Sequence, residues 1–340
     1  MRALPFAALL LAGCATTSAP LATEAPMVAA TAETDPVDTA ADAADDPAIW
    51  RNPADPSKSL VIGTDKKAGI HVYSLAGKRL SFTPAERLNN VDLRDTGARV
   101  IAAASDRADV ATAHVSLFML DTAAAKLVPL GRFPVGAGEA YGMCLWTRAR
   151  DHALFGFIVL KDGRIDQVAI DLSGATPKVT TVRSMKLGTQ SEGCVVDDRT
   201  GQLYVAEEDV GLWRFDADPS AATTATGIAR VDGKTLVADA EGLALAPSGR
   251  TGGYLVASSQ GDNAYTLYRL PGVTYAGRFR IGGGAIDGTS DTDGIDLMLG
   301  DFGPAYPRGL LVAQDGDNAP ATQNFKYVSW DAVRRAFKLR

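Results

Sequence analysis

The sequence lacks the residue patterns on which several classes of hydrolase depend. None of its three His stands in an Arg-His-Gly context, which excludes a mechanism through phosphohistidine. No Gly-x-Ser-x-Gly motif is present, which excludes the nucleophile elbow of serine hydrolases. Cys144 and Arg150 have the Cys-x5-Arg spacing of a cysteine phosphatase loop, but no glycine between them could turn backbone amides towards a phosphate. Residues 282–284 are three glycines without a following helical pattern, which excludes a P-loop.

The sequence also has no excess of positive charge and little helical patterning. Its formal net charge is −6, and a moderately acidic protein has no general attraction to nucleic acid or to an anionic membrane surface. We therefore expect no nucleic-acid partner. Helical periodicity is absent before Trp330, where residues 330–340 predict a short amphipathic helix with Val333, Ala336 and Phe337 facing inward.

The N-terminus has the layout of a secretory signal. An apolar run, too short to span a bilayer stably, leads to the sequence LAGC ending at Cys14. This end resembles a bacterial lipoprotein box, in which Cys14 becomes the acylated first residue; the alternative is an ordinary signal peptide with a chance Cys. We assign residues 1–13 to the signal, residues 14–34, rich in Ala, Thr and Pro, to a flexible tether, and residues 35–340 to the folded domain. We expect secretion to the bacterial cell envelope, in the periplasm or at the outer membrane, with a lipid anchor at Cys14.

Two further cysteines, Cys144 and Cys194, lie in comparable segments of the chain. An oxidising compartment would permit a bridge between them. However, they are one step out of phase in these segments, so on strands they should point to opposite faces. We expect two buried free thiols.

Six repeats account for most of the chain. Each combines short strands rich in β-branched and aromatic residues with turns of Gly, Pro and Asp. The repeats begin at Asp45, Asn89, Tyr141, Glu192, Glu241 and Asp293. Repeats of this period predict an all-β fold, a six-bladed β-propeller with about four antiparallel strands per blade, because a closed ring leaves few exposed strand edges.

The stretch from Asp287 to Asn318 concentrates acidic residues. It contains seven Asp and a single cation, Arg308. Carboxylates packed this closely repel one another unless a hard cation neutralises them, and Ca²⁺ takes about six to eight oxygen ligands. A solvated acidic loop is the alternative, but here the acids alternate with Gly, Ile and Leu as they would at strand ends. The stretch therefore predicts calcium binding and a calcium-stabilised domain.

The loops that follow the second or third strand of each repeat divide the ring by charge. The first three repeats carry cations there, at Lys66, Lys67, Arg107 and Lys161. The last three carry carboxylates and amides, at Glu207, Glu208, Asp209, Gln260, Asp262, Gln314, Asp315, Asp317 and Asn318. A surface salt-bridge lattice would explain any one of these residues, but not their placement in all six repeats. The arrangement predicts a phosphate-rich polyanionic substrate held by Lys and Arg, with in-line attack by a water whose pKa calcium lowers.

Segments in every repeat match a known pattern, in order from about Asp35 to Trp330. They are DDPAIW, TDKKAGIHVYSLAGK, LNNVDLR, AAASDR, YGMCLW, SEGCVVDD, LYVAEEDVGLWRF, DAEGLAL, GYLVASSQGDNAYTLYRL, DGTSDTDGID and GLLVAQDGDN. Together they resemble the β-propeller phytases, the calcium-dependent alkaline type. The resemblance implies hydrolysis of phytate, the hexakisphosphate of myo-inositol, free or as its calcium complex. Its products would be orthophosphate and lower inositol phosphates, formed by attack of a calcium-bound water on phosphorus in an enzyme of the 3-phytase type.

The resemblance also implies roles for particular residues. Phosphate groups would be bound by Lys66, Lys67, Arg107, Tyr141 and Lys161. Calcium would be held by Asp45, Asp46, Glu192, Glu207, Glu208, Asp239, Glu241, Gln260, Asp287, Asp293 and Asn318. The catalytic set would be Lys66, Arg107, Lys161, Asp162 and Glu207, with Glu207 or Glu208 as the general acid. Asp162 stands where the family commonly has Glu, so its side chain is one methylene shorter.

Two alternative functions fit the same fold. A calcium-dependent lactonase or phosphotriesterase-like hydrolase needs a His-based shell, which the scarcity of His disfavours. A non-enzymatic ligand-binding propeller would need neither the cations of the first three repeats nor Glu207. We expect a monomer whose cofactors are several Ca²⁺ ions.

Overall fold

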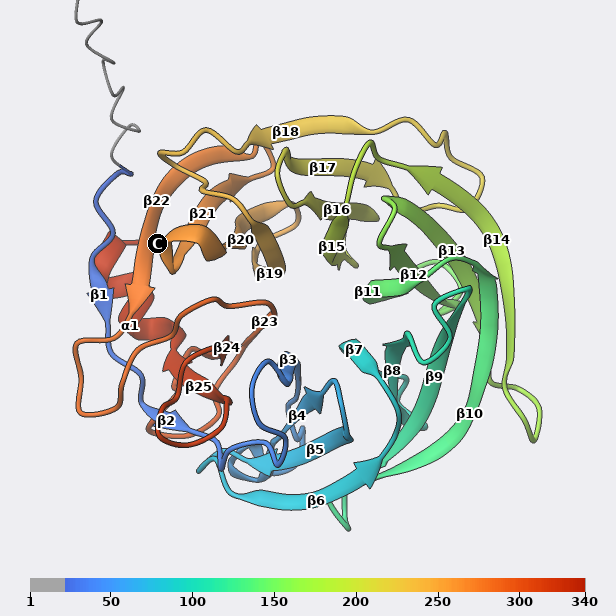
Figure 1. The fold of residues 1–340 in the computed structure, drawn as a ribbon, viewed down its shortest axis with the longest axis horizontal. Coiled ribbons are helices and arrows are strands. Elements are labelled where there is room, and N and C mark those ends of the chain that lie inside the picture. Colours follow the sequence, from blue (N-terminus) through green and yellow to red (C-terminus); the bar gives the residue numbers. More distant parts are fainter. Residues whose placement is uncertain (1–21, 340) are drawn as a thin grey trace, which may run out of the picture.

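The computed structural model describes residues 22–339 of the chain. They form six antiparallel sheets of four strands, arranged as blades around a central axis, and a parallel fifth strand extends one of these sheets (Figure 1). The prediction of a six-bladed β-propeller is therefore confirmed. In each blade the first strand lies beside the axis and the later strands follow outward. The predicted repeat starts lie in or just before these innermost strands, so the repeat boundaries are confirmed as well.

The strands of each blade follow one another in chain order from the axis to the rim. Blade one has β3 (Ala44–Trp50), β4 (Leu60–Asp65), β5 (Gly69–Ser74) and β6 (Arg79–Pro84). Blade two has β7 (Leu88–Asp95), β8 (Val100–Asp106), β9 (Thr112–Asp121) and β10 (Lys126–Ala137). Blade three has β11 (Ala140–Thr147), β12 (Leu154–Leu160), β13 (Arg164–Asp171) and β14 (Lys178–Lys186).

The second half of the ring repeats this arrangement. Blade four has β15 (Ser191–Asp197), β16 (Gln202–Glu207), β17 (Gly211–Asp216) and β18 (Thr226–Arg230). Blade five has β19 (Ala240–Ser248), β20 (Gly252–Ser259), β21 (Ala264–Leu270) and β22 (Thr274–Ile281). Blade six has β23 (Ile295–Leu299), β24 (Gly309–Asp315) and β25 (Asn324–Ser329). Two short 3₁₀ helices, η1 (Pro56–Lys58) and η2 (Gln260–Asp262), follow β3 and β20.

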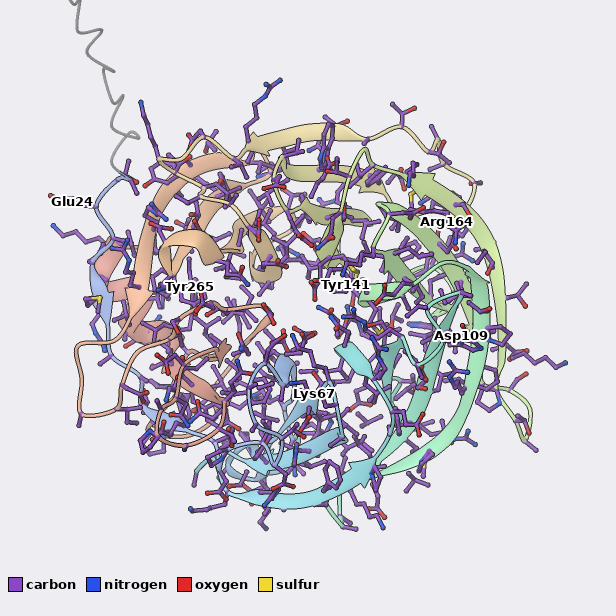
Figure 2. The ribbon with its side chains drawn as sticks, viewed as in Figure 1. Glu24, Lys67, Asp109, Tyr141, Arg164 and Tyr265 are labelled. Carbon is purple, nitrogen blue, oxygen red and sulfur yellow. A yellow bond between two sulfur atoms is a disulfide. The ribbon has the colours of Figure 1, made fainter. Side chains whose placement is uncertain are left out.

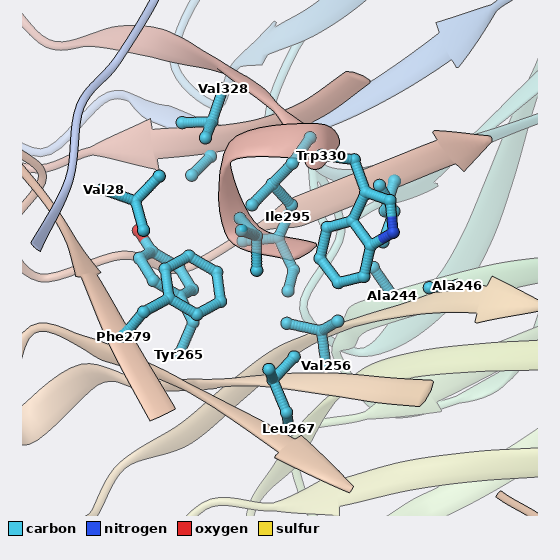
Figure 3. Close-up of a cluster of buried hydrophobic side chains, with 14 of the residues drawn as sticks. Val28, Ala244, Ala246, Val256, Tyr265, Leu267, Phe279, Ile295, Val328 and Trp330 are labelled. Carbon is cyan, nitrogen blue, oxygen red and sulfur yellow. The ribbon is translucent and has the colours of Figure 1, made fainter. Parts of the chain in front are cut away.

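The hydrophobic core lies between the faces of neighbouring blades. Because side chains alternate across a strand, each sheet buries one face against the preceding blade and the other against the following blade. Between blades five and six, Tyr265 and Phe279 of one blade pack with Ile295 and Val328 of the other (Figure 3). Burial on both faces explains why the central residues of the second strands are apolar, as in β4 and β12.

The N-terminal segment closes the ring. Strand β2 (Ala32–Glu33) pairs with β25 and supplies the outer strand of blade six, and β1 (Met27–Val28) pairs parallel with β22 of blade five. The prediction of a flexible tether is therefore wrong for these residues. The sixth repeat contributes three strands of its own, so its outer edge presents unpaired backbone groups that the N-terminal segment satisfies. The predicted signal peptide and Cys14 lie outside the described residues.

The C-terminal helix α1 (Trp330–Phe337) follows β25 directly. Val333 is fully buried and Phe337 packs edge-on against Phe279, as predicted, whereas Ala336 is exposed and that part of the prediction is wrong. With eight residues α1 rests its inward face on blades five and six, and the turn at Ala336 faces outward. Among residues 22–339, no helix is long and apolar enough to cross a membrane.

Cys144 and Cys194 form a disulfide, with their Cα atoms 5.7 Å apart. The prediction of two free thiols is wrong. The cysteines do point to opposite faces of their own sheets, but β11 and β15 belong to neighbouring blades that stack face to face. A residue on one face of blade three therefore meets a residue on the opposite face of blade four. The offset of one residue between the two cysteines would prevent a disulfide within one sheet. Between two stacked sheets, the same offset makes the two side chains face each other.

Candidate functional site

A collar of polar residues surrounds the axis where the six innermost strands begin. It consists of Asp45, Asn89, Tyr141, Glu192, Glu241 and Asp293. Glycine follows four of these residues because the next blade's backbone approaches closely there. A Cβ at Gly142 would lie 1.8 Å from the carbonyl oxygen of Glu192, and one at Gly193 would lie 2.2 Å from that of Glu241. Close backbone contact thus fixes the spacing between neighbouring collar residues.

Three buried glutamates converge beside the collar. Glu192, Glu208 and Glu241 each place a carboxylate oxygen within 4.8 Å of the other two. Burial, together with the charges of nearby acids, raises the pKa of Glu192 and Glu241 well above the usual range, and burial also raises the pKa of Glu208. Like charges this close and this buried cannot all ionise without a cation.

Several carboxylate oxygens of this group lack a hydrogen-bond donor. Within residues 22–339, no donor reaches Asp45 Oδ2, Glu208 Oε1 or Glu241 Oε2, although all three atoms are buried. An unpartnered buried polar atom is costly, so these oxygens fit a group outside the protein. Oxygen-only donors suit a hard cation such as Ca²⁺. We call Asp45, Glu192, Glu208, Glu241 and Asp293 the mouth carboxylates.

Three of the mouth carboxylates, Glu208, Glu241 and Asp293, border a cavity of about 620 Å³ at one end of the channel. Its lining brings together predicted site residues from five blades, namely Lys66, Tyr141, Glu208, Asp239, Glu241, Gln260, Asp293 and Asn318. Figure 2 shows Tyr141 beside the central opening. Gln260 is the first residue of η2, directly after β20, and it donates from Nε2 to Asp293 Oδ1 at 2.7 Å. The structure thus brings eight of the seventeen predicted site residues to the lining of one cavity.

Of the cations of blades one to three, Lys66 lines the cavity, and Arg107 and Lys161 lie over the ring of Tyr141, which also lines it. Lys66 Nζ lies 3.1 Å from Asp45 Oδ1 and 3.0 Å from Asp293 Oδ2. Burial alone would lower the pKa of the Lys66 ammonium, but the two carboxylates outweigh it and raise the pKa. Arg107 and Lys161 lie 5.1 Å and 5.2 Å from the centre of the Tyr141 ring, at cation–π distance. Tyr141 therefore carries the two cations on one aromatic platform.

Besides Arg107 and Lys161, which contact Tyr141, Glu207 and Asp162 of the predicted catalytic set are also absent from the lining of the cavity. Glu207 is 2% exposed, and its Oε1 accepts from the Thr189 backbone N–H at 2.6 Å while its Oε2 accepts from Trp213 Nε1 at 2.7 Å. Because it is the last residue of β16, it points to the opposite side from Glu208. Asp162 is exposed and pairs with Lys186 at 3.1 Å.

Three other predicted site residues lie apart from the cavity. Lys67 donates from Nζ to the Ala40 carbonyl. Asp46 accepts from the Val91 N–H at 2.9 Å, deeper in the channel. Asp287 is exposed, and it joins a separate cluster around the buried ammonium of Lys326.

The Lys326 cluster lies at the outer part of blade six. Besides Asp287, it contains Glu33 of β2, Asp315 and Asn318, whose Oδ1 lies 3.2 Å from Lys326 Nζ. The predicted calcium ligands therefore separate into a group at the mouth and a group around this lysine, with Asn318 also lining the cavity. The sequence gives no signal for Lys326, which stands in an ordinary strand pattern.

Sequence reasoning also missed two amides that hold the glutamates. Asn89 Nδ2 donates to Glu192 Oε1 at 2.7 Å, and Gln190 Nε2 donates to Glu208 Oε2 at 2.8 Å. Asn89 also accepts from Arg107, which links the cationic side to the acidic side. Asn89 stands at the start of the second repeat, and this position could have identified it as a site residue.

A second group of carboxylates lies further along the channel, beside a cavity of about 330 Å³. Asp46, Asp92 and Asp296 each accept from a backbone N–H of the following blade, at 2.9, 2.8 and 2.8 Å. We call these three residues the channel carboxylates. Their hydrogen bonds join blade one to two, two to three and six to one.

The fold and the site define a β-propeller with a charge-divided mouth suited to a multiply charged anion. The sequence model of the phytase family, described as "Phytase", matches residues 3–339. The chain is also 42% identical, over 325 residues, to "3-phytase" of Bacillus subtilis (strain 168), which covers 90% of this chain and 84% of the relative. The chain therefore belongs to the phytase family and is a phytase enzyme. A solved structure titled "Crystal Structure of Mitotic Checkpoint Complex" matches with a TM-score of 0.50 and 13% identity, over 98% of this chain and 86% of the other, a likeness of fold alone.

Proposed function

We propose that this phytase depends on calcium, and that it releases orthophosphate from phytate at the cavity bordered by the mouth carboxylates. The observation that carries the proposal is the set of buried, unpartnered oxygens on Asp45, Glu208 and Glu241. Lys66 lies beside Asp45, and Arg107 and Lys161 lie over Tyr141, which lines the same cavity as Glu208 and Glu241. A carboxylate wall alone would repel phytate. A phosphate site built from Lys66, Arg107 and Lys161 alone would not explain why buried carboxylate oxygens lack hydrogen-bond donors.

The residues present fit a calcium ion. Glu192, Glu208 and Glu241 would hold it, with Asp239, Gln260 and Asp293 at the edge of the same cavity. Bound calcium would offset phosphate charge and lower the pKa of a coordinated water. It would also stabilise the fold, because it binds the folded chain and relieves the repulsion among the glutamates.

The cationic side supplies substrate binding. Arg107 presents a planar fork to phosphate oxygens and Lys161 a point charge, and the Tyr141 ring beneath them restricts both. Lys66 lies among the carboxylates and forms ion pairs with Asp45 and Asp293. Phytate carries six phosphates. One phosphate would therefore bind at the calcium held by the mouth carboxylates, while other phosphates bind Arg107 and Lys161.

Proton transfer falls to Glu208 rather than Glu207. Hydrolysis forms a bond from water oxygen to phosphorus and breaks the bond to the inositol oxygen, which must take up a proton. Glu207 has donors on both oxygens, whereas Glu208 borders the cavity with Oε1 free of donors from residues 22–339. With the ion held mainly by Glu192 and Glu241, Glu208 would use Oε1 to pass a proton to the inositol oxygen.

Orthophosphate release from phytate tests the proposal. The protein should begin no later than residue 22, because residues 27–33 complete blades five and six. We expect release in excess calcium, loss of release in excess chelator, and a lower melting temperature in chelator. A folded protein that releases no orthophosphate with calcium would favour a non-enzymatic binding propeller, and release unchanged by chelator would contradict the calcium requirement.

We also propose secretion to the cell envelope with a lipid anchor at Cys14. The Cys144–Cys194 disulfide supports this location, because disulfides persist in oxidising compartments. Replacing Cys14 with Ser should move the protein from the membrane fraction to the soluble fraction. An unchanged distribution would contradict the anchor.

A further inference from the structure

The disulfide joins the two blades that carry Tyr141 and Glu192. Cys144 lies on β11, three residues after Tyr141, and Cys194 lies on β15, two residues after Glu192. Both cysteines are buried, at 2% and 8% exposure. The covalent bond therefore links the innermost strands of blades three and four directly behind the collar.

Corresponding positions between other blades are held by weaker interactions. Ala48 packs near Val91 between blades one and two, and Ala244 packs near Ile295 between blades five and six. Between blades two and three, Asp92 accepts from the Leu145 N–H. Within residues 22–339, the Cys144–Cys194 disulfide between blades three and four is the one covalent link between side chains of different blades.

As in blades one, two and five, the strand ladder does not fix the collar residues of these two blades. In β11 the pairing register shifts between Ala140 and Gly142, so Tyr141 falls in a bulge. In β15 it shifts between Ser191 and Cys194, so Glu192 also falls in a bulge. A bulged residue lacks a regular ladder partner, and its position depends on what anchors the strand next to it.

That position matters at the mouth. Glu192 is one of the three glutamates whose oxygens lie within 4.8 Å of one another, and Tyr141 carries Arg107 and Lys161 at cation–π distance. A small shift between β11 and β15 would move an acidic ligand and the phosphate-binding platform relative to each other. The close contact between Gly142 and Glu192 prevents β11 and β15 from moving closer together. A steric contact does not prevent the two strands from moving apart.

We propose that the Cys144–Cys194 disulfide is a positioning element of the active site, which holds Glu192 and Tyr141 at a fixed separation. This inference rests on the proposed calcium function. It predicts that removing the bond weakens calcium binding and turnover more than the accompanying loss of stability explains.

The test compares a disulfide-free protein with an equally destabilised control. Cys144→Ala/Cys194→Ala removes the bond, and Cys144→Val/Cys194→Ala refills the space if the first variant does not fold. Leu120→Ala, in buried strand β9 away from the collar, lowers stability without touching the site. Calcium affinity is measured by calorimetry below every melting transition, and kcat and KM for phytate are measured at saturating calcium.

We expect the calcium Kd of the disulfide-free variant to rise about tenfold, equivalent to about 1.4 kcal/mol, and kcat to fall, with both values unchanged in Leu120→Ala. Equal Kd and kcat in all folded proteins, with only the melting temperature lowered, would overturn the positioning role. If the unaltered protein binds no calcium and releases no orthophosphate, the proposed calcium function fails instead, and the two failures are distinguishable.

Discussion

The mouth carboxylates and the channel carboxylates are two groups of inward-facing acids in the same ring, and they differ in what their oxygens contact. Each channel carboxylate accepts from a backbone N–H of the next blade. At the mouth, Asp45 Oδ2, Glu208 Oε1 and Glu241 Oε2 have no donor from residues 22–339. The protein itself supplies donors to the first group, whereas three buried oxygens of the second group have no donor from these residues.

Burial and charge alone do not separate the two groups. Burial raises the pKa of Asp293 at the mouth and of Asp296 in the channel, in both cases to about 7. The two groups differ in their hydrogen-bond donors. The Asp296 carboxylate accepts from the backbone N–H groups of Ile49 and of the next residue, Leu297. The Asp293 carboxylate accepts from the side chains of Lys66 and Gln260. Side chains can move aside for a ligand more readily than a backbone amide inside a sheet.

The largest expected effect is at the mouth. Glu241→Gln keeps the shape of the side chain but removes the charge of a carboxylate with an unpartnered oxygen. We expect kcat for phytate to fall about 100-fold, the scale of removing one preorganised electrostatic group, and calcium affinity to fall with it. Calorimetry and orthophosphate release measure the two quantities.

The stability of this variant sharpens the comparison. Removing one of three mutually repelling glutamates should leave the calcium-free protein as stable as the unaltered chain or more so. A calcium-free protein that unfolds more easily than the unaltered chain would place Glu241 with the channel carboxylates instead.

The sequence carries most of the fold and much of the site. Repeat starts at Asp45, Tyr141 and Glu192 are correct because strand, turn and Gly patterns recur with each blade. The same periodicity brings Lys66 and Glu241 to one cavity, since equivalent positions in a closed ring face one axis.

Features that depend on two distant segments could not be predicted in this way. Glu207 and Glu208 are adjacent acids, and only the end of β16 decides which one faces the cavity. The pairing of β2 with β25 involves no local pattern, and neither does the burial of Lys326 among oxygens from three separate segments. The disulfide required knowledge that β11 and β15 lie in stacked blades rather than in one sheet.

A smaller effect is expected in the channel. Asp296→Ala would leave the Ile49 and Leu297 N–H groups without their acceptor, which should lower the free energy of unfolding by about 1–3 kcal/mol. Urea unfolding in saturating calcium measures this loss. Asp296→Asn retains an acceptor oxygen and should recover part of the stability.

Calcium binding should not change in either Asp296 variant. The carboxylate lies outside the mouth cavity, so the calcium Kd should match that of the unaltered chain. A weakened Kd in Asp296→Asn would show that the two groups of carboxylates act together, and the distinction between them would fail.

The smallest effect is a pH dependence that differs between the groups. Asp293 and Asp296 have folded-state pKa values of about 7, above the ordinary Asp value of 3.8, so the folded chain binds more protons than the unfolded chain between these limits. Its free energy of unfolding must therefore fall as the pH rises from about 4 to about 7. His71 opposes this trend, because burial lowers its pKa from 6.5 to about 4.

Comparison with Asp296→Asn removes the His71 contribution, which is common to both proteins. In saturating calcium, the stability of the unaltered chain relative to Asp296→Asn should decline as the pH rises towards 7, because the charged form of Asp296 is the one that burial penalises. The increment that calcium gives the unaltered chain should grow over the same range, since fewer protons compete for the mouth carboxylates. A calcium increment that is constant from pH 4 to pH 7 would mean that the mouth carboxylates are already ionised without the metal, and that their burial is compensated within the protein.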